Sequence, residues 1–272
     1  MGEWDEDNTK DGATIHILRN ARIPDAHTES QMILLVLSLC LATELHQYAA
    51  EGSLMLDDVM TTHVEQQNEI CDKHNALRRQ EGGKNMLKMK WNAKIAANAQ
   101  KYADQCIYEH SPKASRKIDG RNCGENLFMS STIFPWSYVC ESWYNEKKDF
   151  VYGVGASPKG AMVGHYTQVV WATTYEMGCG VAYCPNQGKL KYFFVCQYSP
   201  AGNVDGKRET PYKKGTPCAD CPDHCDQGLC TNPCLHNNQY SNCDPLTKQW
   251  GCNHPDLKEE CKASCKCTTE IR

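Results

Sequence analysis

Ten of the 18 cysteines fall between Cys218 and Cys267, and this density restricts the fold more than any other feature of the sequence. The stretch has few apolar side chains, so it cannot form a stable core without crosslinks. Zinc is one alternative, because Cys218 and Cys221 have the C-x-x-C spacing of zinc ligands. No second pair of this kind follows at zinc-finger spacing, and the other cysteines stand singly. The pattern favours disulfides and therefore an oxidising compartment.

An apolar run over residues 32–42 agrees with secretion. It has the length of a signal-peptide core, is too short to span a membrane and begins at Met32, whereas the preceding residues are polar. We predict that residues 1–31 are an upstream extension and that residues 32–50 are a signal peptide, whose removal takes Cys40 with it. A signal anchor formed by the same run is the alternative, and mass spectrometry of the mature N-terminus separates the two. The predicted location is secreted and extracellular.

Apolar periodicity predicts alternating helices and strands in the middle of the chain. The predicted elements are helices over 64–79, 91–106 and 136–144 and strands over 165–173, 178–184 and 190–199. In the second helix, one face carries Trp91, Ile95, Ala99, Tyr102 and Cys106. The last strand is apolar on both faces, which is typical of a central strand covered on both sides. Helices on the two faces of a sheet would give an α-β-α sandwich, in the α+β class.

The first of these strands contains a histidine. Alternation would direct Tyr166, Gln168 and Val170 to one side and His165, Thr167, Val169 and Trp171 to the other. A histidine beside apolar strand residues either packs in the core or belongs to a site, and the alternation leaves both interpretations open. The net charge of −4 gives no indication of a nucleic-acid partner.

Two motifs and the cysteine spacing resemble a known family. Residues 164–171, GHYTQVVW, and residues 193–203, FFVCQYSPAGN, resemble the two signature motifs of the CAP superfamily. From Cys218 onward, the spacing C-x2-C-x3-C-x4-C-x3-C-x8-C-x8-C-x8-C-x3-C-x-C resembles the tail of the cysteine-rich secretory proteins. The overall pattern is similar to that of mammalian epididymal or reproductive-tract members of this family.

The resemblance implies a domain organisation. An α-β-α sandwich CAP domain would occupy residues 60–203. A disulfide-rich hinge would occupy 218–230, and a cysteine-rich domain similar to potassium-channel-blocking toxins would occupy 231–272. Between the CAP domain and the hinge, the composition changes to Gly, Asn, Asp, Lys and Pro, which predicts a linker over 204–217.

The resemblance also implies a cleft with two histidines and two glutamates. The matching residues are His110, Glu125, Glu146 and His165. His110 and His165 would hold a labile zinc ion and leave coordination positions for water. Glu125 and Glu146 would orient the imidazoles or that water, although Glu125 could instead tie a loop. His74, on the face of a predicted helix, is expected to pack.

The resemblance further implies seven disulfides. They are Cys106–Cys184, Cys179–Cys196, Cys218–Cys225, Cys221–Cys230, Cys234–Cys267, Cys243–Cys261 and Cys252–Cys265. This sequence departs from the family pattern, because Ser199 stands where the family has the partner of Cys123, and the family usually has no cysteine at positions 71 and 140. We predict that Cys123 is unpaired, and that Cys71 and Cys140 either pair with each other or are buried thiols.

The implied function is that of a secreted, non-enzymatic binding protein. It would act on a membrane ion channel through its cysteine-rich domain, or on a sperm or other cell surface in fertilisation. Tyr240 and Trp250 are candidate anchors in that domain, or else its small core. A sterol or lipid carrier, or a metal-dependent hydrolase that uses the cleft, is the alternative. Neither G-x-S-x-G nor H-E-x-x-H occurs, and Ser111 and Thr167 have no nucleophile context, so the sequence disfavours the hydrolase.

Overall fold

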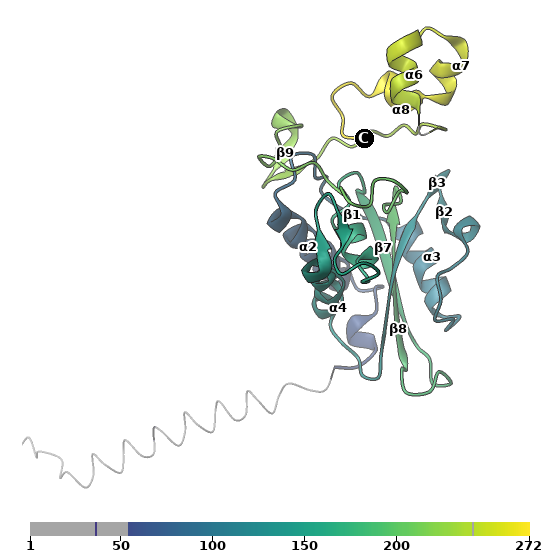
Figure 1. Cartoon of the computed structure of the whole chain (residues 1–272). Coiled ribbons are helices and arrows are strands. Elements are labelled where there is room, and N and C mark those ends of the chain that lie inside the picture. Colours follow the sequence, from purple (N-terminus) through teal and green to yellow (C-terminus); the bar gives the residue numbers. More distant parts are fainter. Residues whose placement is uncertain (1–35, 37–53, 241) are drawn as a thin grey trace, which may run out of the picture. The chain divides into compact units, whose positions relative to one another are not determined.

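A four-stranded sheet between two layers of helices forms the main body of the chain (Figure 1). The computed structural model describes residues 54–240 and 242–272, together with Val36. The predicted upstream extension, the signal peptide and Cys40 therefore lie outside the described part, Val36 excepted. The main helices are α2 (Val64–Glu81), α3 (Ala93–Ala103), α4 (Trp136–Tyr144) and α5 (Gly164–Val169). The spatial order of the strands is β1 (Lys90–Trp91), β7 (Glu176–Tyr183), β8 (Tyr192–Ser199) and β4 (Gly124–Ser130).

Short elements occupy the loops and the C-terminal part. The two-residue strands are β2 (Lys117–Ile118), β3 (Arg121–Asn122), β5 (Phe150–Val151), β6 (Gly155–Ala156), β9 (Cys225–Asp226) and β10 (Leu229–Cys230). The remaining helices are η1 (Asp57–Val59), η2 (Lys113–Arg116), η3 (Asn145–Asp149), η4 (Pro222–His224), α6 (Cys243–Trp250), α7 (Pro255–Glu260) and α8 (Lys262–Lys266). Among the residues that the structure describes, no helix combines the length and the apolar character needed to cross a membrane.

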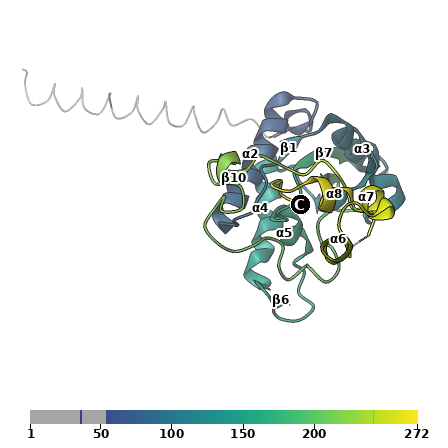
Figure 2. The same cartoon turned by 90° about the horizontal axis from the view of Figure 1, so that it is seen from above.

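The central strand β8 shows why helices cover both faces of the sheet. It pairs antiparallel with β7 on one side and with β4 on the other, and it is buried over almost its whole length, as predicted for this run. Phe193 and Val195 face α3, whereas Phe194, Cys196 and Tyr198 face α2 and α4. Both faces of the sheet are therefore apolar and both are covered by helices (Figure 2).

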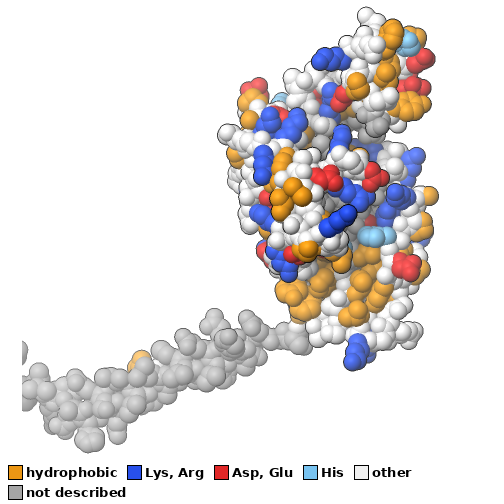
Figure 3. Space-filling view, in the orientation of Figure 1, with side chains coloured by type: hydrophobic (Ala, Val, Ile, Leu, Met, Phe, Trp, Pro, Cys, Tyr) orange, Lys and Arg blue, Asp and Glu red, His pale blue; other side chains and the backbone are white. Residues whose placement is uncertain are grey.

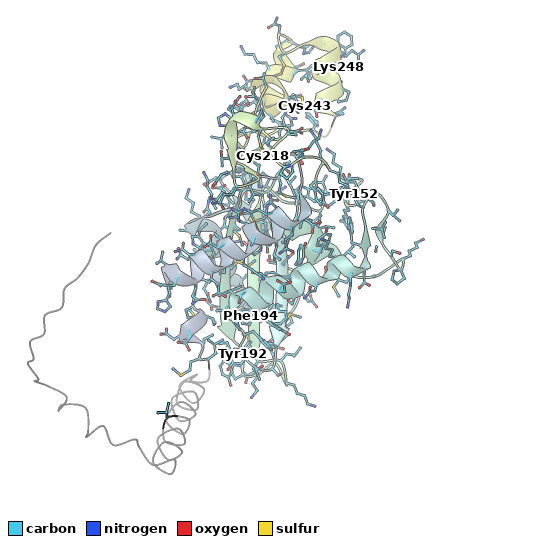
Figure 4. All side chains as sticks on the ribbon, turned by 90° about the vertical axis from the view of Figure 1, so that its left-hand side faces the viewer. Tyr152, Tyr192, Phe194, Cys218, Cys243 and Lys248 are labelled. Carbon is cyan, nitrogen blue, oxygen red and sulfur yellow. A yellow bond between two sulfur atoms is a disulfide. The ribbon has the colours of Figure 1, made fainter. Side chains whose placement is uncertain are left out.

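The layer formed by α2 and α4 is packed with aromatic side chains. Trp136 and Phe194 meet edge to face with ring centroids 5.1 Å apart, and both are fully buried. Figure 4 labels Phe194 and Tyr192 on β8 in a view from the side of these two helices. The indole N–H of Trp136 donates to the carbonyl of Val59 at 2.8 Å, which fixes the segment before α2 to this layer.

The predicted helix over 91–106 is too long at both ends. Trp91 belongs to strand β1, and α3 begins after Asn92, whose side-chain oxygen accepts from the backbone N–H groups of Lys94 and Ile95. This is an N-cap, a signal that the apolar spacing alone does not carry. At the other end, Cys106 lies beyond the helix with a positive φ of 55°. The helices predicted over 64–79 and 136–144 are confirmed as α2 and α4.

The predicted strand over 165–173 is wrong. Residues 164–169 form helix α5, and the two alternating faces do not exist, because Tyr166 to Ala172 are all buried. Distant side chains satisfy both ends of this short helix. The carboxylate of Glu146 accepts from the N–H groups of His165 and Tyr166 at the first turn, and the guanidinium of Arg78 donates to the carbonyls of Val169 and Trp171 at the last. Tertiary contacts therefore override the strand propensity of these residues.

The segment predicted as a linker over 204–217 is not a free tether. Tyr212 is 6% exposed and packs in the main core, and its hydroxyl donates to Glu81 at 3.0 Å. The backbone N–H of Lys84 donates to the carbonyl of Lys213 at 2.9 Å. A composition of polar residues and prolines predicted a loop correctly but could not show that one buried aromatic anchors it.

The hinge over 218–230 also packs against the sandwich. The N–H of Lys88 donates to the carbonyl of Cys230, and the N–H of Cys230 donates to the carbonyl of Met86, each at 2.8 Å. A salt bridge of 2.6 Å joins Lys88 to Asp226. Two disulfides, Cys218–Cys225 and Cys221–Cys230, close the hinge itself.

Disulfides and three short helices hold the C-terminal module over 231–272. Figure 4 labels Cys218 in the hinge and Cys243 in this module. The structure contains the same seven pairs that the family resemblance implies: Cys106–Cys184, Cys179–Cys196, Cys218–Cys225, Cys221–Cys230, Cys234–Cys267, Cys243–Cys261 and Cys252–Cys265. In the described part of the chain, Cys71, Cys123 and Cys140 are free, and the last two are buried. Cys71 and Cys140 are therefore thiols in this structure and not a disulfide.

Candidate functional site

Two histidine–glutamate pairs form the candidate site. Nδ1 of His110 lies 2.9 Å from Oε1 of Glu125, and Nδ1 of His165 lies 2.6 Å from Oε1 of Glu146. The structure thus joins the four predicted residues as two separate pairs. Within the described residues, neither ring has a hydrogen bond at Nε2. A carboxylate at Nδ1 with a free Nε2 is the usual arrangement of a histidine that binds a metal through Nε2.

Glu125 is the acceptor at the centre of a buried polar cluster. Its side chain is fully buried in β4. Besides His110, its donors are the backbone N–H and the hydroxyl of Ser111, the guanidinium of Arg116 and the amide of Gln197, at 2.6 to 3.0 Å. Burial alone would raise the pKa of Glu125, but these hydrogen bonds and the charge of Arg116 outweigh it and leave the pKa below its usual value. Glu125 is therefore a fixed carboxylate that orients the His110 ring, and it also ties the loop before η2.

Glu146 has two roles in the second pair. Oε1 accepts from the ring of His165, while Oε2 accepts from the backbone N–H groups of His165 and Tyr166 at 2.9 and 3.1 Å. The same carboxylate thus satisfies the first turn of α5 and sets the orientation of the imidazole. The indole of Trp143 stacks beside this ring, with centroids 6.4 Å apart and planes at 28°.

A series of buried hydrogen bonds supports the backbone of His165. The amide of Asn126 donates to the carbonyl of His165 at 3.1 Å and lies 3.5 Å from the hydroxyl of Tyr198. That hydroxyl lies 3.0 Å from Nε2 of His74, whose Nδ1 lies 2.8 Å from the carbonyl of Ile70. A carbonyl can only accept, so the proton of His74 is on Nδ1 and the Tyr198 hydroxyl donates to Nε2.

His74 is therefore a neutral structural residue, in agreement with the packing role expected for it. It is fully buried, and burial lowers its pKa to about 4, with the nearby Arg78 charge acting in the same direction. The thiol of Cys140 lies 3.5 Å from Nδ1 of His74. Because that nitrogen carries a proton already donated to Ile70, it cannot take the proton of the thiol, and the contact does not activate Cys140.

The donor set fits a weakly held metal better than a closed structural site. Within the described residues, no three ligand atoms of the two pairs lie within 4.8 Å of one another. The group that does meet this limit, Cys218, Cys221 and Cys230, consists of half-cystines, which have no thiolate to offer. Among the described residues, His110 and His165 each have an imidazole Nε2 without a hydrogen bond, and a metal bound to such a nitrogen would keep water in its other coordination positions.

The hydroxyls near these pairs are not placed as nucleophiles. The hydroxyl of Ser111 donates to Glu125 and not to His110, so the histidine does not stand between the hydroxyl and the acid. The hydroxyl of Thr167 lies 3.0 Å from the carbonyl of Val163 and 2.6 Å from the side-chain oxygen of Asn203. Neither arrangement can remove a proton from the hydroxyl in the way that a catalytic triad does.

Sequence reasoning missed three residues that build the site: Arg116, Asn126 and Gln197. Gln197 had a detectable signal, since it is a polar residue on an otherwise apolar strand face. Its side-chain oxygen accepts from Asn98 at 2.7 Å, which leaves its amide group free to donate to Glu125. Arg116 had no signal, because it lies in a polar loop where a buried arginine cannot be told from an exposed one.

Comparisons with known proteins agree with the sequence motifs. A family model described as "Cysteine-rich secretory protein family" matches residues 71–198, and a model described as "Crisp" matches residues 218–272. The cysteine-rich venom protein helothermine of Heloderma horridum horridum is 54% identical over 243 residues, which cover 89% of this chain and 100% of that protein. Cysteine-rich secretory protein 2 of Homo sapiens is 53% identical over 215 residues, which cover 78% of this chain and 88% of that protein.

Solved structures share the fold of the sandwich. The crystal structure of NaASP2 with Zn2+ has a TM-score of 0.53 at 31% identity and covers 66% of this chain and 100% of that chain. The crystal structure of Na-ASP-1 has a TM-score of 0.51 at 30% identity and covers 61% of this chain and 46% of that chain.

Proposed function

We infer that this chain, which belongs to the cysteine-rich secretory protein family of the CAP superfamily, is a secreted binding protein without catalytic activity. Its target is a membrane ion channel, and residues 231–272 are the part that binds it. A role at the sperm surface in reproduction is the second part of the proposal. It is tested by binding of labelled protein to sperm in competition with unlabelled protein.

The exposure of large side chains on the C-terminal module carries the proposal. Leu235 is 70% exposed, Tyr240 is 51% exposed and Trp250 is 63% exposed. The interior of the module is made instead of half-cystines with Leu257 and Ala263, so the two aromatic residues are not its core. Figure 3 shows apolar side chains on the surface of this module among acidic ones. Exposed aromatics on a rigid, crosslinked scaffold lose little entropy on binding and are typical interface anchors.

Replacing Trp250 with alanine should weaken channel block about 30-fold. A tryptophan that becomes buried in a partner typically contributes about 2 kcal/mol or more, and 1.4 kcal/mol is a factor of ten in affinity. The measurement is the half-blocking concentration of the full chain on voltage-gated potassium currents, the class indicated by the toxin-like module.

Tyr183→Ala is the matched control, because Tyr183 is a 45% exposed aromatic on β7 of the sandwich. It should leave the half-blocking concentration unchanged. If Tyr183→Ala removed the block and Trp250→Ala did not, the active surface would lie on the sandwich and the proposal would be wrong.

The two histidine–glutamate pairs support a second activity, reversible zinc binding. The observation in its favour is that both histidines keep Nε2 free while a carboxylate holds Nδ1. With only imidazole donors from the chain, zinc would be held weakly and would keep water, or an anionic group of a ligand, in its other positions. A sterol or lipid carrier would use the same domain, and bound lipid in protein from its native fluid tests that alternative.

Replacing Glu146 with glutamine should weaken zinc binding 10- to 100-fold, the range seen when a partner of a metal-binding histidine is lost. The amide keeps the size of the side chain but removes the charge that aligns the His165 ring. Calorimetric titration with zinc measures the effect, and Glu65→Gln, at an exposed position of α2, is the control. Equal affinities in all three proteins would contradict the site, and peptide hydrolysis that is lost in Glu146→Gln would contradict the absence of catalysis.

A further inference from the structure

A cavity of about 440 Å³ lies beside the His110–Glu125 pair, and the free cysteine Cys123 is part of its wall. The volume is in the range of about 300–1,000 Å³ that is typical of small-molecule sites. The wall also contains Lys113, Arg116 and Arg208. Cys123 itself is 4% exposed, so its place in the wall of this cavity is the route that the structure offers to a reagent.

Among the described residues, Cys123 is unpaired, and its neighbour across the sheet is a serine. The ladder between β4 and β8 pairs Gly124 with Tyr198, so the next position places Cys123 opposite Ser199. Ser199 is 1% exposed, and its hydroxyl has no hydrogen-bond partner among the described residues. The structure therefore has a place for a disulfide but only one of the two sulfur atoms.

The charges of the cavity favour an anionic ligand. Arg116 is 8% exposed, and its Nε is buried without a partner, although its neighbouring nitrogen donates to Glu125. Lys113 is exposed and has no ion pair among the described residues. Arg208 is paired only with the exposed Asp205, at 2.8 Å, and exposed pairs of this kind are weak. The carboxylates of Glu125 and Asp205 also line the wall and pair with Arg116 and Arg208, so the unpaired Lys113 and the weakly paired Arg208 are the cationic groups that remain available to a ligand carboxylate.

We propose that Cys123 is a modification site for a small anionic disulfide, such as glutathione disulfide or cystine, which binds in this cavity. The thiolate of Cys123 attacks one sulfur of the ligand, so a new bond forms between them and the disulfide bond of the ligand breaks. The other half of the ligand leaves as a thiolate and takes up the proton that Cys123 lost. One disulfide replaces another, so no oxidant is needed. This inference is independent of the channel-directed function.

The other two free cysteines differ from Cys123 in the ways that the proposal needs. Neither Cys71 nor Cys140 belongs to the wall of the cavity. Burial and the charge of Asp72 raise the pKa of Cys71 to about 12, and burial raises the pKa of Cys140 well above its usual value. Burial also raises the pKa of Cys123, but Ser199, Arg121 and Arg116 act against it. Cys71 is more exposed than Cys123, so Cys123 is distinguished by its place in the cavity wall and by neighbours that oppose the rise of its thiol pKa.

Two probes test the proposal on the full secreted chain. Glutathione disulfide is an anionic disulfide, and cystamine is a cationic one. Intact mass and peptide mapping should find one glutathione adduct, on Cys123, with Cys71 and Cys140 unmodified. Cystamine should react with Cys123 about tenfold more slowly, because the cationic wall repels it. An adduct on Cys71 would overturn the site. The site would also be overturned if Cys123 formed an adduct in the unfolded chain but not in the folded protein. Equal rates for the two probes would overturn the anionic ligand.

Three variants sharpen the test. Lys113→Glu, at an exposed position, should slow glutathione disulfide and accelerate cystamine. Ser199→Cys should form a disulfide with Cys123, which removes the adduct and lowers the number of free thiols in the described part from three to two. Cys71→Ser is the matched control and should keep the adduct. An adduct that persists in Ser199→Cys would show that the reaction occurs elsewhere.

Discussion

Replacing Arg78 with methionine should lower the free energy of unfolding by about 4 kcal/mol or more, because it leaves several buried carbonyl groups without donors. Arg78 is fully buried in α2. Its guanidinium donates, at 2.6 to 3.1 Å, to the carbonyl oxygens of Leu87, Val169, Trp171, Ala172 and Thr174. No carboxylate pairs with it among the described residues, so these dipoles alone compensate its charge.

The charge persists at neutral pH. Burial lowers the pKa of Arg78 to about 9, against a smaller opposing contribution from Tyr198, and this value is still above 7. Arg78→Lys keeps a charge but offers three donors on one atom in place of a planar fork, so it cannot reach carbonyls on both sides of the side chain. The lysine variant should therefore lose about 2 kcal/mol or more.

Denaturation by guanidinium chloride with the disulfides intact measures both losses. Arg79→Met is the control at the neighbouring position, because Arg79 is only partly buried and makes one exposed hydrogen bond, from Nε to the carbonyl of Gln227 at 3.0 Å. It should change the stability by about 0.5 kcal/mol at most. An unchanged midpoint for Arg78→Met, or an equal shift for Arg79→Met, would contradict the role of the buried guanidinium.

Arg78 also explains why the segment that holds His165 could not be predicted. The residues after His165 are aromatic and β-branched, and such residues alternate in strands, so a local pattern predicts a strand. The helix forms instead because Glu146 and Arg78, 19 positions before His165 and 91 positions before Val169, satisfy its two ends. A local pattern cannot contain contacts of this range.

Other parts were predictable because one local signal decided them. The run that became β8 is apolar on both faces, and the structure covers both faces with helices. The run that became α4 has an apolar face and a proline directly before it, and the helix has the predicted bounds. The strand β4 was missed because it starts with Gly124, Glu125 and Asn126, which resemble a loop until their buried partners are known.

The candidate site was predicted by residue type but not by geometry. The motifs supplied His110, Glu125, Glu146 and His165, whereas the separation into two pairs depends on side-chain directions that no spacing reveals. The buried Arg116 and Gln197 that hold Glu125 lie 9 and 72 positions away from it. The polar character of both residues was visible in the sequence, but the burial of Arg116 was not.

Replacing Gly178 with alanine should destabilise the fold by about 3 kcal/mol, because helix α3 lies directly on the backbone of β7. A Cβ at Gly178 would lie 2.1 Å from the backbone nitrogen of Ala96 and 2.6 Å from its Cα. These are backbone atoms, which cannot turn aside as the end of a side chain can. The helix as a whole would have to move away from the sheet.

Such a movement has further costs. The side-chain amide of Gln100 donates to the carbonyl of Val181 at 2.8 Å, and its oxygen accepts from the N–H of the same residue at 3.1 Å. These two bonds extend the hydrogen bonding of β7 into α3, and a shift of the helix would break them. The disulfide Cys106–Cys184 joins the chain just after α3 to the end of β7 and opposes the shift. The clash therefore remains as strain or as lost hydrogen bonds.

A second-site test distinguishes backbone contact from ordinary overpacking. Ala96→Gly removes only a Cβ, so it should not rescue Gly178→Ala, because the clash is with the nitrogen and Cα of residue 96. Gly164→Ala is the matched control, because a Cβ at Gly164 would meet nothing closer than a side-chain nitrogen of Asn203 at 3.9 Å. Its free energy of unfolding should differ from that of the original chain by about 1 kcal/mol at most. Rescue by Ala96→Gly would mean that side chains, and not the two backbones, set the distance between helix and sheet.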